Sequence, residues 1–266
     1  LGKDKLISET EIEQDEVDGG TSATGTYNDE YIQYYTGTGV TTASNYKTGT
    51  YLLEFDLMAR AKAEASCFES NQGQYITVSS PEFATQEEVK FIKDAWDEVE
   101  TAVYDHRLDE VRDKIDVESF VKMYIIQELS KNLDSAASSY NILYKAEEGK
   151  FYAQPVWDYD WAVGNYWRTK DIKSGTNSSD DPSTTSGYFS RYKKILLADG
   201  NALNKFNFQA MLCDNESFWA DAQNIWTNEA NAKATTEKNN VSDYMDAIQA
   251  SVEMNDTRWG HLAINN

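Results

Sequence analysis

Three aspartates stand where the chain leaves apolar runs, and their carboxylates are the groups best placed to do chemistry. Asp158 and Asp160 alternate with aromatic residues in the run PVWDYDWAVGN, which begins at Pro155. Asp134 lies in NLDSAAS, directly after a helical pattern. A buried carboxylate without a partner costs several kcal/mol. Acids in such positions are therefore expected to be paired, hydrogen-bonded or bound to a metal ion.

The segments between these acids predict a β-hairpin. The apolar runs YNILYK and FYAQPVW flank the short turn AEEGK, which is the usual pattern of two antiparallel strands. If Lys145 faces Lys150 across the turn, paired positions sum to 295. Asp134 then lies at the open end of the hairpin together with Asp158 and Asp160, and we expect the three carboxylates to converge there.

Converging carboxylates raise one another's pKa, and a hard divalent cation with oxygen ligands relieves the repulsion. We therefore interpret Asp134, Asp158 and Asp160 as a metal-binding cluster. The alternative is that one or two of them cap backbone amides or pair with nearby basic side chains. The aromatic residues between the acids are expected in the core, and only Trp157 is considered as a residue that could flank a bound base.

Three reaction classes use such an arrangement. A glycosidase needs two carboxylates beside a sugar, but Ala162 stands where the DxDxE run of one chitinase class has its glutamate. A nucleotide-sugar transferase uses a DxD metal clamp, but the chain lacks the alternating strand and helix pattern of the usual nucleotide fold. Phosphoryl transfer needs an acid that orients the attacking hydroxyl and, after a hairpin, an acid that holds Mg²⁺ on the ATP phosphates. Asp134 and Asp158 follow that order.

The elements around these acids predict an α+β fold that is mostly helical, with a small antiparallel sheet. TYLLEFDL at 50–57 and QYITVSS at 74–80 predict strands. Apolar residues at three- and four-residue steps after Thr85 predict a long amphipathic helix. Asp116 is expected to cap a second helix, whose buried face runs from Val117 to Leu129. Further helices are expected around Ile195, Leu196, Phe206, Phe208, Phe218, Trp219, Ile225, Trp226, Ile248 and Trp259.

The chain is expected to begin with an acidic, polar segment at 1–49 that is irregular or short-stranded, followed by the main domain at 50–266. Within that domain, the Ser- and Thr-rich stretch 169–190 predicts a flexible polar loop or a lid. The opening LGKDKLISETEIEQDEV has neither an initiator methionine nor an apolar signal region, which is expected of a mature or truncated chain.

Composition narrows the classes of partner. The chain has 266 residues, of which 40% are apolar, and a formal net charge of −21. Such a charge repels nucleic acid and anionic membranes, and no run of about 18 apolar residues predicts a membrane span. Cys67 and Cys213 are the only cysteines; they are expected either to form one disulfide or to be buried thiols.

The run DVESFVKMYIIQELSKNLDSAASSYNILYK, followed by PVWDYDWAVGN, resembles the spore coat protein H (CotH) kinase family. The family has an Asn-x-Asp segment and a Pro-Val-Trp-Asp-Phe-Asp segment that ends in Gly-Asn. TYLLEFD, SSPE, KFIKDAWDEVE, RYKKILLADG and NDTRWG fit the same family in the same order. The likeness covers about residues 50 to 260.

The resemblance implies a protein-kinase-like C-terminal lobe that uses Mg²⁺ (or Mn²⁺) and ATP to phosphorylate protein hydroxyls. It implies a bacterial protein that is extracellular or on the spore or cell surface. Asp134 matches the catalytic-loop acid, Asp158 the metal-binding acid, and Asp160 the second acid of the Asp-Phe-Asp segment. The family also has a β-rich lobe ahead of the matched region, which we expect to be absent or truncated here.

Two points stay open at this stage. A kinase-like asparagine is expected five residues after Asp134, where Ser139 stands, so the second metal ligand is either Asn141 after a one-residue shift or Asp160. The protein itself is either a kinase acting on a protein substrate or a non-catalytic module with an assembly partner, for example in a cellulosome.

Overall fold

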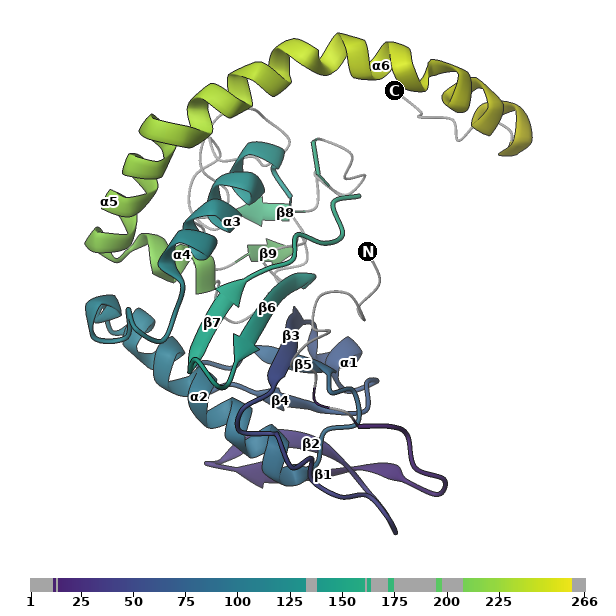
Figure 1. The fold of residues 1–266 in the computed structure, drawn as a ribbon, viewed down its shortest axis with the longest axis vertical. Helices are drawn as coiled ribbons and strands as arrows, with labels where there is room; N and C mark the ends of the chain where they lie inside the picture. Colours follow the sequence, from purple (N-terminus) through teal and green to yellow (C-terminus); the bar gives the residue numbers. More distant parts are fainter. Residues whose placement is uncertain are drawn as a thin grey trace. The chain divides into compact units, whose positions relative to one another are not determined.

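The computed structural model describes residues 12, 14–132, 138–160, 162–163, 172–174, 195–197 and 208–259. The chain divides into two units, residues 1–222 and 223–266. The first unit contains both sheets and most of the helices (Figure 1). The second contains the end of the helix Glu216–Ile225 (α5), a π-helical turn at Trp226–Ala230 and the helix Asn231–Trp259 (α6).

The first unit is built on a seven-stranded antiparallel sheet with the order β1-β2-β4-β5-β3-β6-β7. Its strands are Thr21–Tyr27 (β1), Glu30–Thr36 (β2), Thr50–Asp56 (β3), Cys67–Glu69 (β4), Tyr75–Ser80 (β5), Tyr140–Lys145 (β6) and Lys150–Ala153 (β7). The expected α+β class is confirmed. The sheet is larger than expected because β1, β2 and β4 join the strands that the sequence indicates.

Two of these additional strands lie within the segment 1–49. β1 and β2 form a hairpin whose turn residues, Asn28 and Asp29, have φ values of 53° and 70°. Positive φ at both central residues is the signature of a type I′ turn, which matches the twist of two antiparallel strands. This segment therefore contributes the edge of the sheet.

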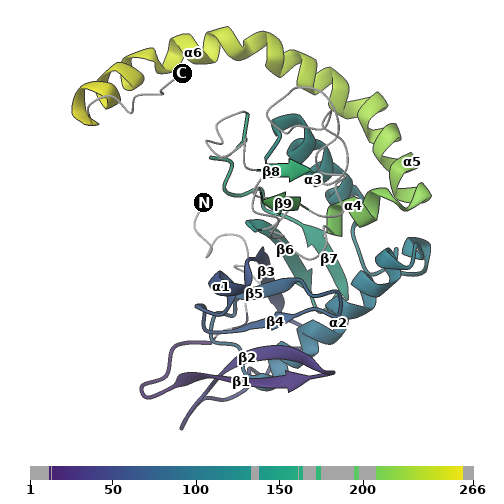
Figure 2. The same ribbon diagram turned by 180° about the vertical axis from the view of Figure 1, so that it is seen from behind.

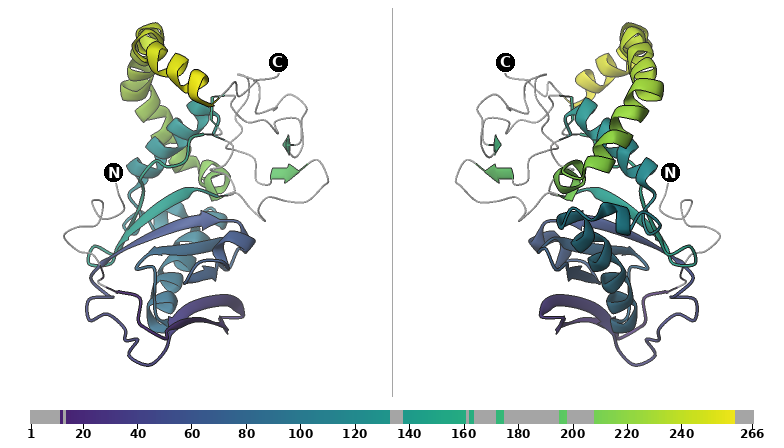
Figure 3. Two further views of the ribbon diagram at one scale, coloured as in Figure 1. Left: turned by 90° about the vertical axis from the view of Figure 1, so that its right-hand side faces the viewer. Right: turned by 90° about the vertical axis from the view of Figure 1, so that its left-hand side faces the viewer.

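The long helix predicted after Thr85 is confirmed as Gln86–Tyr104 (α2), and it crosses one face of the sheet (Figures 2 and 3). Thr85 and Glu88 form a capping box at its start, in which each side chain satisfies a backbone amide at the helix end. Its buried face carries Trp96, whose ring packs edge-on against Phe55 of β3 and Phe151 of β7. The main core thus lies between α2 and the central strands.

The second predicted helix is confirmed as Val117–Ser130 (α3). Its N-cap is Asp116, whose Oδ1 accepts a hydrogen bond from the Ser119 amide at 2.8 Å. Phe120, on the expected face, is buried. The prediction for Leu129 was wrong, because this residue is 54% exposed near the end of the helix.

The β6–β7 hairpin forms with the predicted register. Lys145 pairs with Lys150 and Ile142 pairs with Ala153, so paired positions do sum to 295. The ladder ends at Ala153, and the mirrored positions expected beyond it are not part of the strands. On its other side β6 pairs with β3, which places the hairpin beside the centre of the sheet.

The remaining elements are short. They are the helices Met58–Ala61 (α1) and Phe208–Cys213 (α4), a 3₁₀ turn at Leu108–Glu110, and a two-stranded sheet of Ile172–Ser174 (β8) and Ile195–Leu197 (β9). Helical structure was expected at Ile195 and Leu196, and the strand β9 corrects that expectation. Part of the predicted loop 169–190 is the strand β8, and its other residues lie outside the described ones.

The two cysteines are not joined to each other. Both Cys67 in β4 and Cys213 in α4 are buried, and neither is part of a disulfide. Burial raises the pKa of the Cys67 thiol to about 12. Of the two expectations, buried thiols are therefore observed.

Candidate functional site

Asp158 follows the β6–β7 hairpin and presents its side chain to solvent. The residue is exposed, and its backbone has a φ of 56°. Aspartate is one of the few residues other than glycine that adopt this left-handed region with any frequency. Its carboxylate oxygen Oδ2 accepts a hydrogen bond from Ser139 Oγ at 3.3 Å. A carboxylate is thus held at the surface by the residue that precedes β6.

Two buried polar residues from before the hairpin fix the segment around Asp158. Ser139 is 3% exposed and Asn132 is fully buried. The Asn132 side-chain amide donates to the backbone carbonyl of Asp158 at 3.5 Å. Further along the segment, the Val163 amide donates to the carbonyl of Ser130 at 2.6 Å. These bonds connect the end of α3 to the residues that follow β7.

The run DYD alternates in its exposure. Asp158 and Asp160 are exposed, whereas Tyr159 between them is partly buried. Burial raises the pKa of the Tyr159 phenol to about 12, although a contact with the Gln127 side chain of α3 acts in the opposite direction. Tyr159 is therefore the residue of the run that turns towards the protein, near Gln127 of α3, while both acids are exposed.

Trp157 departs from the expectation that the aromatic residues are core. Its side chain is 57% exposed, beside the exposed Asp158. An exposed indole is available to stack on a planar ligand. This agrees with the minor possibility that Trp157 alone flanks a bound base, a role that stays a prediction.

Asn141, the other candidate metal ligand, lies within the sheet. It is 6% exposed in β6, where it pairs with Glu54 of β3. Ser139, two residues earlier, is the one that contacts the Asp158 carboxylate. The geometry therefore connects Ser139, the residue at the expected position of a kinase asparagine, directly with the candidate metal-binding acid.

The predicted cluster of three acids is only partly described. Asp134, its third member, lies outside the described residues, which resume at Ser138. Among the residues that the structure describes, no three His, Cys, Asp or Glu side chains are grouped closely enough to hold a metal ion. The convergence of Asp134 with Asp158 and Asp160 stays a prediction.

The DYD run and Ser139 nevertheless carry the kind of ligand that suits a hard cation. They supply carboxylate oxygens from Asp158 and Asp160 and a hydroxyl oxygen from Ser139. Mg²⁺ prefers such oxygen ligands and is usually held in nucleotide sites by one or two carboxylates together with the substrate phosphates. The donor set fits a metal–nucleotide complex rather than a closed metal cage.

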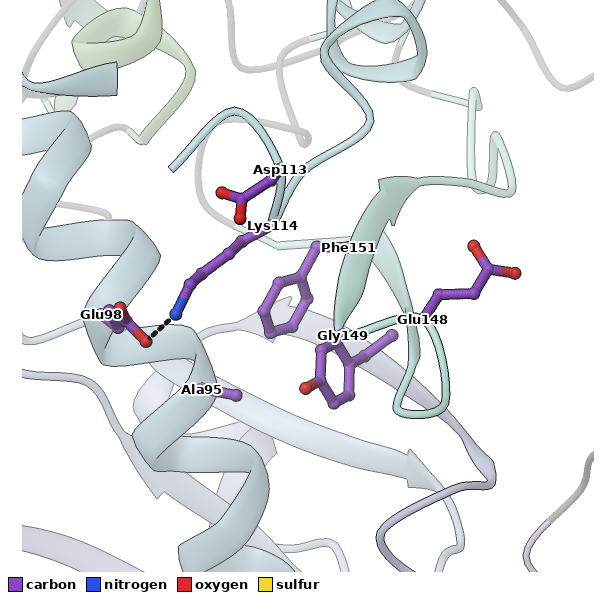
Figure 4. Close-up of a pocket in the computed structure, with 8 residues that line it drawn as sticks. Ala95, Glu98, Asp113, Lys114, Glu148, Gly149 and Phe151 are labelled. Atoms are coloured by element: carbon purple, nitrogen blue, oxygen red, sulfur yellow. Dashed lines mark ion pairs between the residues drawn. The ribbon is translucent and has the colours of Figure 1, made fainter. Parts of the chain in front are cut away.

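A pocket of about 290 Å³ lies away from the predicted residues, between α2, Lys114 and the β6–β7 turn (Figure 4). Lys114 Nζ forms an ion pair with Glu98 at 2.5 Å across it, and Asp113 and Glu148 also belong to its lining. None of the described candidate site residues, Trp157, Asp158, Asp160, Ser139 and Asn141, lines this pocket. Surface ion pairs of this kind contribute little to stability, and nothing assigns the pocket a ligand.

Sequence reasoning missed the part that Asn132 plays at the site. Asn132 is the first residue of the Asn-x-Asp segment, and the signal available was a polar residue directly after an apolar helical run. Its contact with the Asp158 carbonyl joins positions 26 residues apart. A pairing over this distance follows from the folded hairpin and not from local spacing.

No described helix combines the length and the apolar character needed to cross a membrane.

A search of curated proteins and a search of solved structures each found no match to the chain. A family model described as CotH kinase protein matches residues 29–266. That range is most of the chain, and it includes α3, the hairpin and the DYD run that carry the resemblance. The chain belongs to the CotH kinase protein family.

Proposed function

We propose that this protein is a CotH-type protein kinase, which transfers a phosphoryl group from ATP to Ser or Thr hydroxyls of secreted or surface proteins. The observation that carries the proposal is the exposed Asp158 in a chain of this family: its carboxylate accepts a hydrogen bond from Ser139, and its backbone carbonyl accepts one from Asn132. The proposed location is extracellular or on the spore or cell surface of a bacterium.

Each residue of the site has a distinct proposed role. Asp158 binds the Mg²⁺ or Mn²⁺ that accompanies ATP, with Asp160 or Asn141 as a further ligand. Ser139 orients the Asp158 carboxylate through its hydroxyl. Trp157 flanks the nucleotide base, and Asp134 accepts the proton of the attacking hydroxyl. When bound, the metal ion neutralises charge on the ATP phosphates and lowers the barrier to transfer.

The test is a combination of binding and turnover. Calorimetric titration with ATP is expected to show binding only when Mg²⁺ is present. A phosphotransfer assay with Ser-rich protein substrates is expected to show turnover, and Asp134→Asn should reduce it by about 10²-fold or more, since that is the usual effect of removing a general base. The affinity for ATP should change only a few-fold, because Asp134 acts on the hydroxyl and not on the nucleotide.

One result of the titration would contradict the kinase proposal. If the protein shows no Mg²⁺-dependent nucleotide binding, the kinase proposal is wrong. A non-catalytic module of an extracellular or spore-surface assembly is then the better description of the same fold.

A further inference from the structure

The two edges of the seven-stranded sheet differ in how they are covered. The outer edge of β7 is closed by the segment before α3: Phe151 forms a parallel bridge with Ile115 and exchanges backbone hydrogen bonds with Lys114 and Asp116. β1 forms the opposite edge, and within the part of the chain that the structure describes it pairs only with β2 (Figure 2). The question is whether the outer side of β1 is available for another strand.

The register of the β1–β2 hairpin shows which backbone groups point outward. In an antiparallel pair, hydrogen-bonded and non-hydrogen-bonded residue pairs alternate. A two-residue type I′ turn is closed by a hydrogen-bonded pair, here Tyr27 and Glu30. Independently, the Tyr35 amide donates to the carbonyl of Ala84, away from β1, which makes the pair of Tyr35 and Ser22 non-hydrogen-bonded.

The turn and the Tyr35 hydrogen bond give the same alternation of hydrogen-bonded and non-hydrogen-bonded pairs along β1. Thr21, Ala23, Gly25 and Tyr27 bond to β2, so the N–H and C=O groups of Ser22, Thr24 and Thr26 point away from the sheet. No backbone hydrogen bond to these outward groups occurs among the described residues. The side chains of Ser22, Thr24 and Thr26 are also exposed.

β1 lacks the features that usually keep sheet edges from pairing. Proteins protect free edges with charged residues, proline, bulges or very short strands. β1 has the sequence TSATGTY, without charge or proline, and its seven residues pair with β2 in continuous register. Such an edge is suited to β-augmentation, in which an extended segment adds a strand through main-chain hydrogen bonds.

The charges near β1 indicate what kind of strand would bind. Asp15, Glu16 and Asp18 precede the strand and Asp29 follows it, and all four are exposed. A second copy of the chain, paired antiparallel about Thr24 by a twofold axis, would bring the turn that carries Asp29 in one copy next to the turn that carries Asp18 in the other, at both ends. Like charges brought close together repel each other. The acidic flanks therefore favour a strand with basic ends over self-association.

We infer that the free edge of β1 is a docking site for an extended segment of a protein partner, with an uncharged β-prone core and basic residues at its ends. This inference does not depend on the proposed kinase activity. It uses only the hairpin at the edge opposite β7 and the acids around it.

The experiment uses the full chain and a synthetic peptide of alternating threonine and valine with a lysine at each end. Binding is measured by fluorescence anisotropy, and amide exchange is followed by NMR. We expect the amides of Ser22, Thr24 and Thr26 to become protected when the peptide binds. Thr24→Pro should weaken binding about tenfold or more because it removes an outward N–H, whereas Thr24→Val should stay within a few-fold.

Further controls change the peptide and use the wild-type protein. Two versions are N-methylated at alternate amides, one at odd and one at even positions; one of them should bind and the other should not, because only one set of amides faces β1. A peptide with glutamate at each end should bind about tenfold more weakly.

Four results would overturn the inference. The lysine-ended peptide does not bind, or both methylated versions bind equally well. Alternatively, Thr24→Pro binds the lysine-ended peptide as tightly as the wild-type protein does, or the glutamate-ended peptide binds as tightly as the lysine-ended one. Light scattering that shows a dimer with protected β1 amides would assign the edge to a second copy instead.

Discussion

At the scale of single residues, the backbone of Asp158 decides which substitution is informative. Its φ of 56° lies in a region that asparagine and aspartate adopt more readily than alanine does. Asp158→Ala therefore changes backbone strain and charge together. Asp158→Asn keeps the shape and the backbone preference, removes the charge and replaces one acceptor oxygen with an NH₂ group.

We expect Asp158→Asn to abolish Mg²⁺-dependent ATP binding, because a hard ion loses its anionic ligand. In EDTA the melting temperature should be unchanged or higher, since the substitution removes one negative charge from a strongly acidic chain. Calorimetry with Mg²⁺-ATP and thermal melts in EDTA measure the two effects. Asp113→Asn, at an exposed acid in the pocket beside Lys114 and away from Asp158, is the matched control and should bind ATP normally.

A different outcome would identify Asp158 as a structural acceptor. If Asp158→Asn lowers the melting temperature in EDTA and leaves the response to Mg²⁺ intact, the carboxylate serves to hold Ser139 and not a metal ion.

The choice between Ser139 and Asn141 is also testable. Because Ser139 Oγ contacts Asp158 Oδ2 and Asn141 lies in β6 opposite Glu54, we expect Ser139→Ala to weaken Mg²⁺-dependent ATP binding more than Asn141→Ala. The expected loss is about three- to tenfold, the scale of one hydrogen bond to a charged group. A larger loss from Asn141→Ala, measured by the same titration, would instead support a one-residue shift of the catalytic loop.

The sequence singles out Asp158 and Asp160 as candidate ligands, but it does not predict the contacts that Asn132 and Ser139 make with Asp158. Asp158 and Asp160 are noticeable in the sequence because carboxylates are unusual in a run of aromatic residues. Asn132 and Ser139 act through contacts across the hairpin. Ser139 does so with a φ of 56°, and neither such a backbone angle nor such a contact has a local sequence signal.

At the scale of elements, α2 carries a buried carboxylate that ties it to the β4–β5 turn. Glu100 is fully buried and accepts hydrogen bonds from Ser70 Oγ at 3.0 Å and from the Gln72 amide at 3.2 Å. Burial raises the pKa of Glu100 to about 8, and the nearby charge of Asp97 also raises it. The folded protein therefore keeps a proton on Glu100 that the unfolded chain releases near 4.5, the ordinary pKa of a glutamate side chain.

This difference predicts a pH dependence of stability. The folded state binds the proton more tightly, so the contribution of Glu100 is fully present below about 4.5 and declines as pH rises to about 8. The expected slope is about 1.4 kcal/mol per pH unit in that window. Glu100→Gln should remove this decline between pH 6 and 8, as measured by urea unfolding.

The control is Glu98→Gln on the same helix, whose side chain is 56% exposed in its ion pair with Lys114. It should leave the decline unchanged. A decline of equal slope in wild type and in Glu100→Gln would show that other groups cause it. The chain has only two histidines, so few side chains compete in this pH range.

Elements with a strong local period were predictable, and polar or very short ones were not. The apolar spacing of α2, the Asp116 cap of α3 and the Gly-containing turn of β6–β7 are local signals, and all three are confirmed. β1 is a polar strand at the edge of the sheet, and β4 has three residues. Both take their structure from neighbouring strands, which a scan along the chain does not detect.

At the scale of the whole molecule, charge must be separated from specific metal binding. A net charge of −21 destabilises any compact state through self-repulsion, so both NaCl and MgCl₂ are expected to raise the melting temperature by screening. Stabilisation by MgCl₂ alone therefore says nothing about a site. The informative quantity is the difference between the rise in melting temperature in MgCl₂ and the rise in NaCl at equal ionic strength, called the magnesium excess below.

We expect a magnesium excess in the wild-type protein, and we expect ATP to enlarge it. A ligand that binds only the folded state adds stability as its concentration rises above Kd. Asp158→Asn should retain the response to NaCl and lose the excess, since the surface charge is almost unchanged while the proposed ligand is gone. Thermal melts of both proteins in the two salts, at matched ionic strength, measure this directly. An excess of the same size in Asp158→Asn would place divalent-ion binding elsewhere on the acidic surface and would remove the physical basis for assigning Asp158 to the metal.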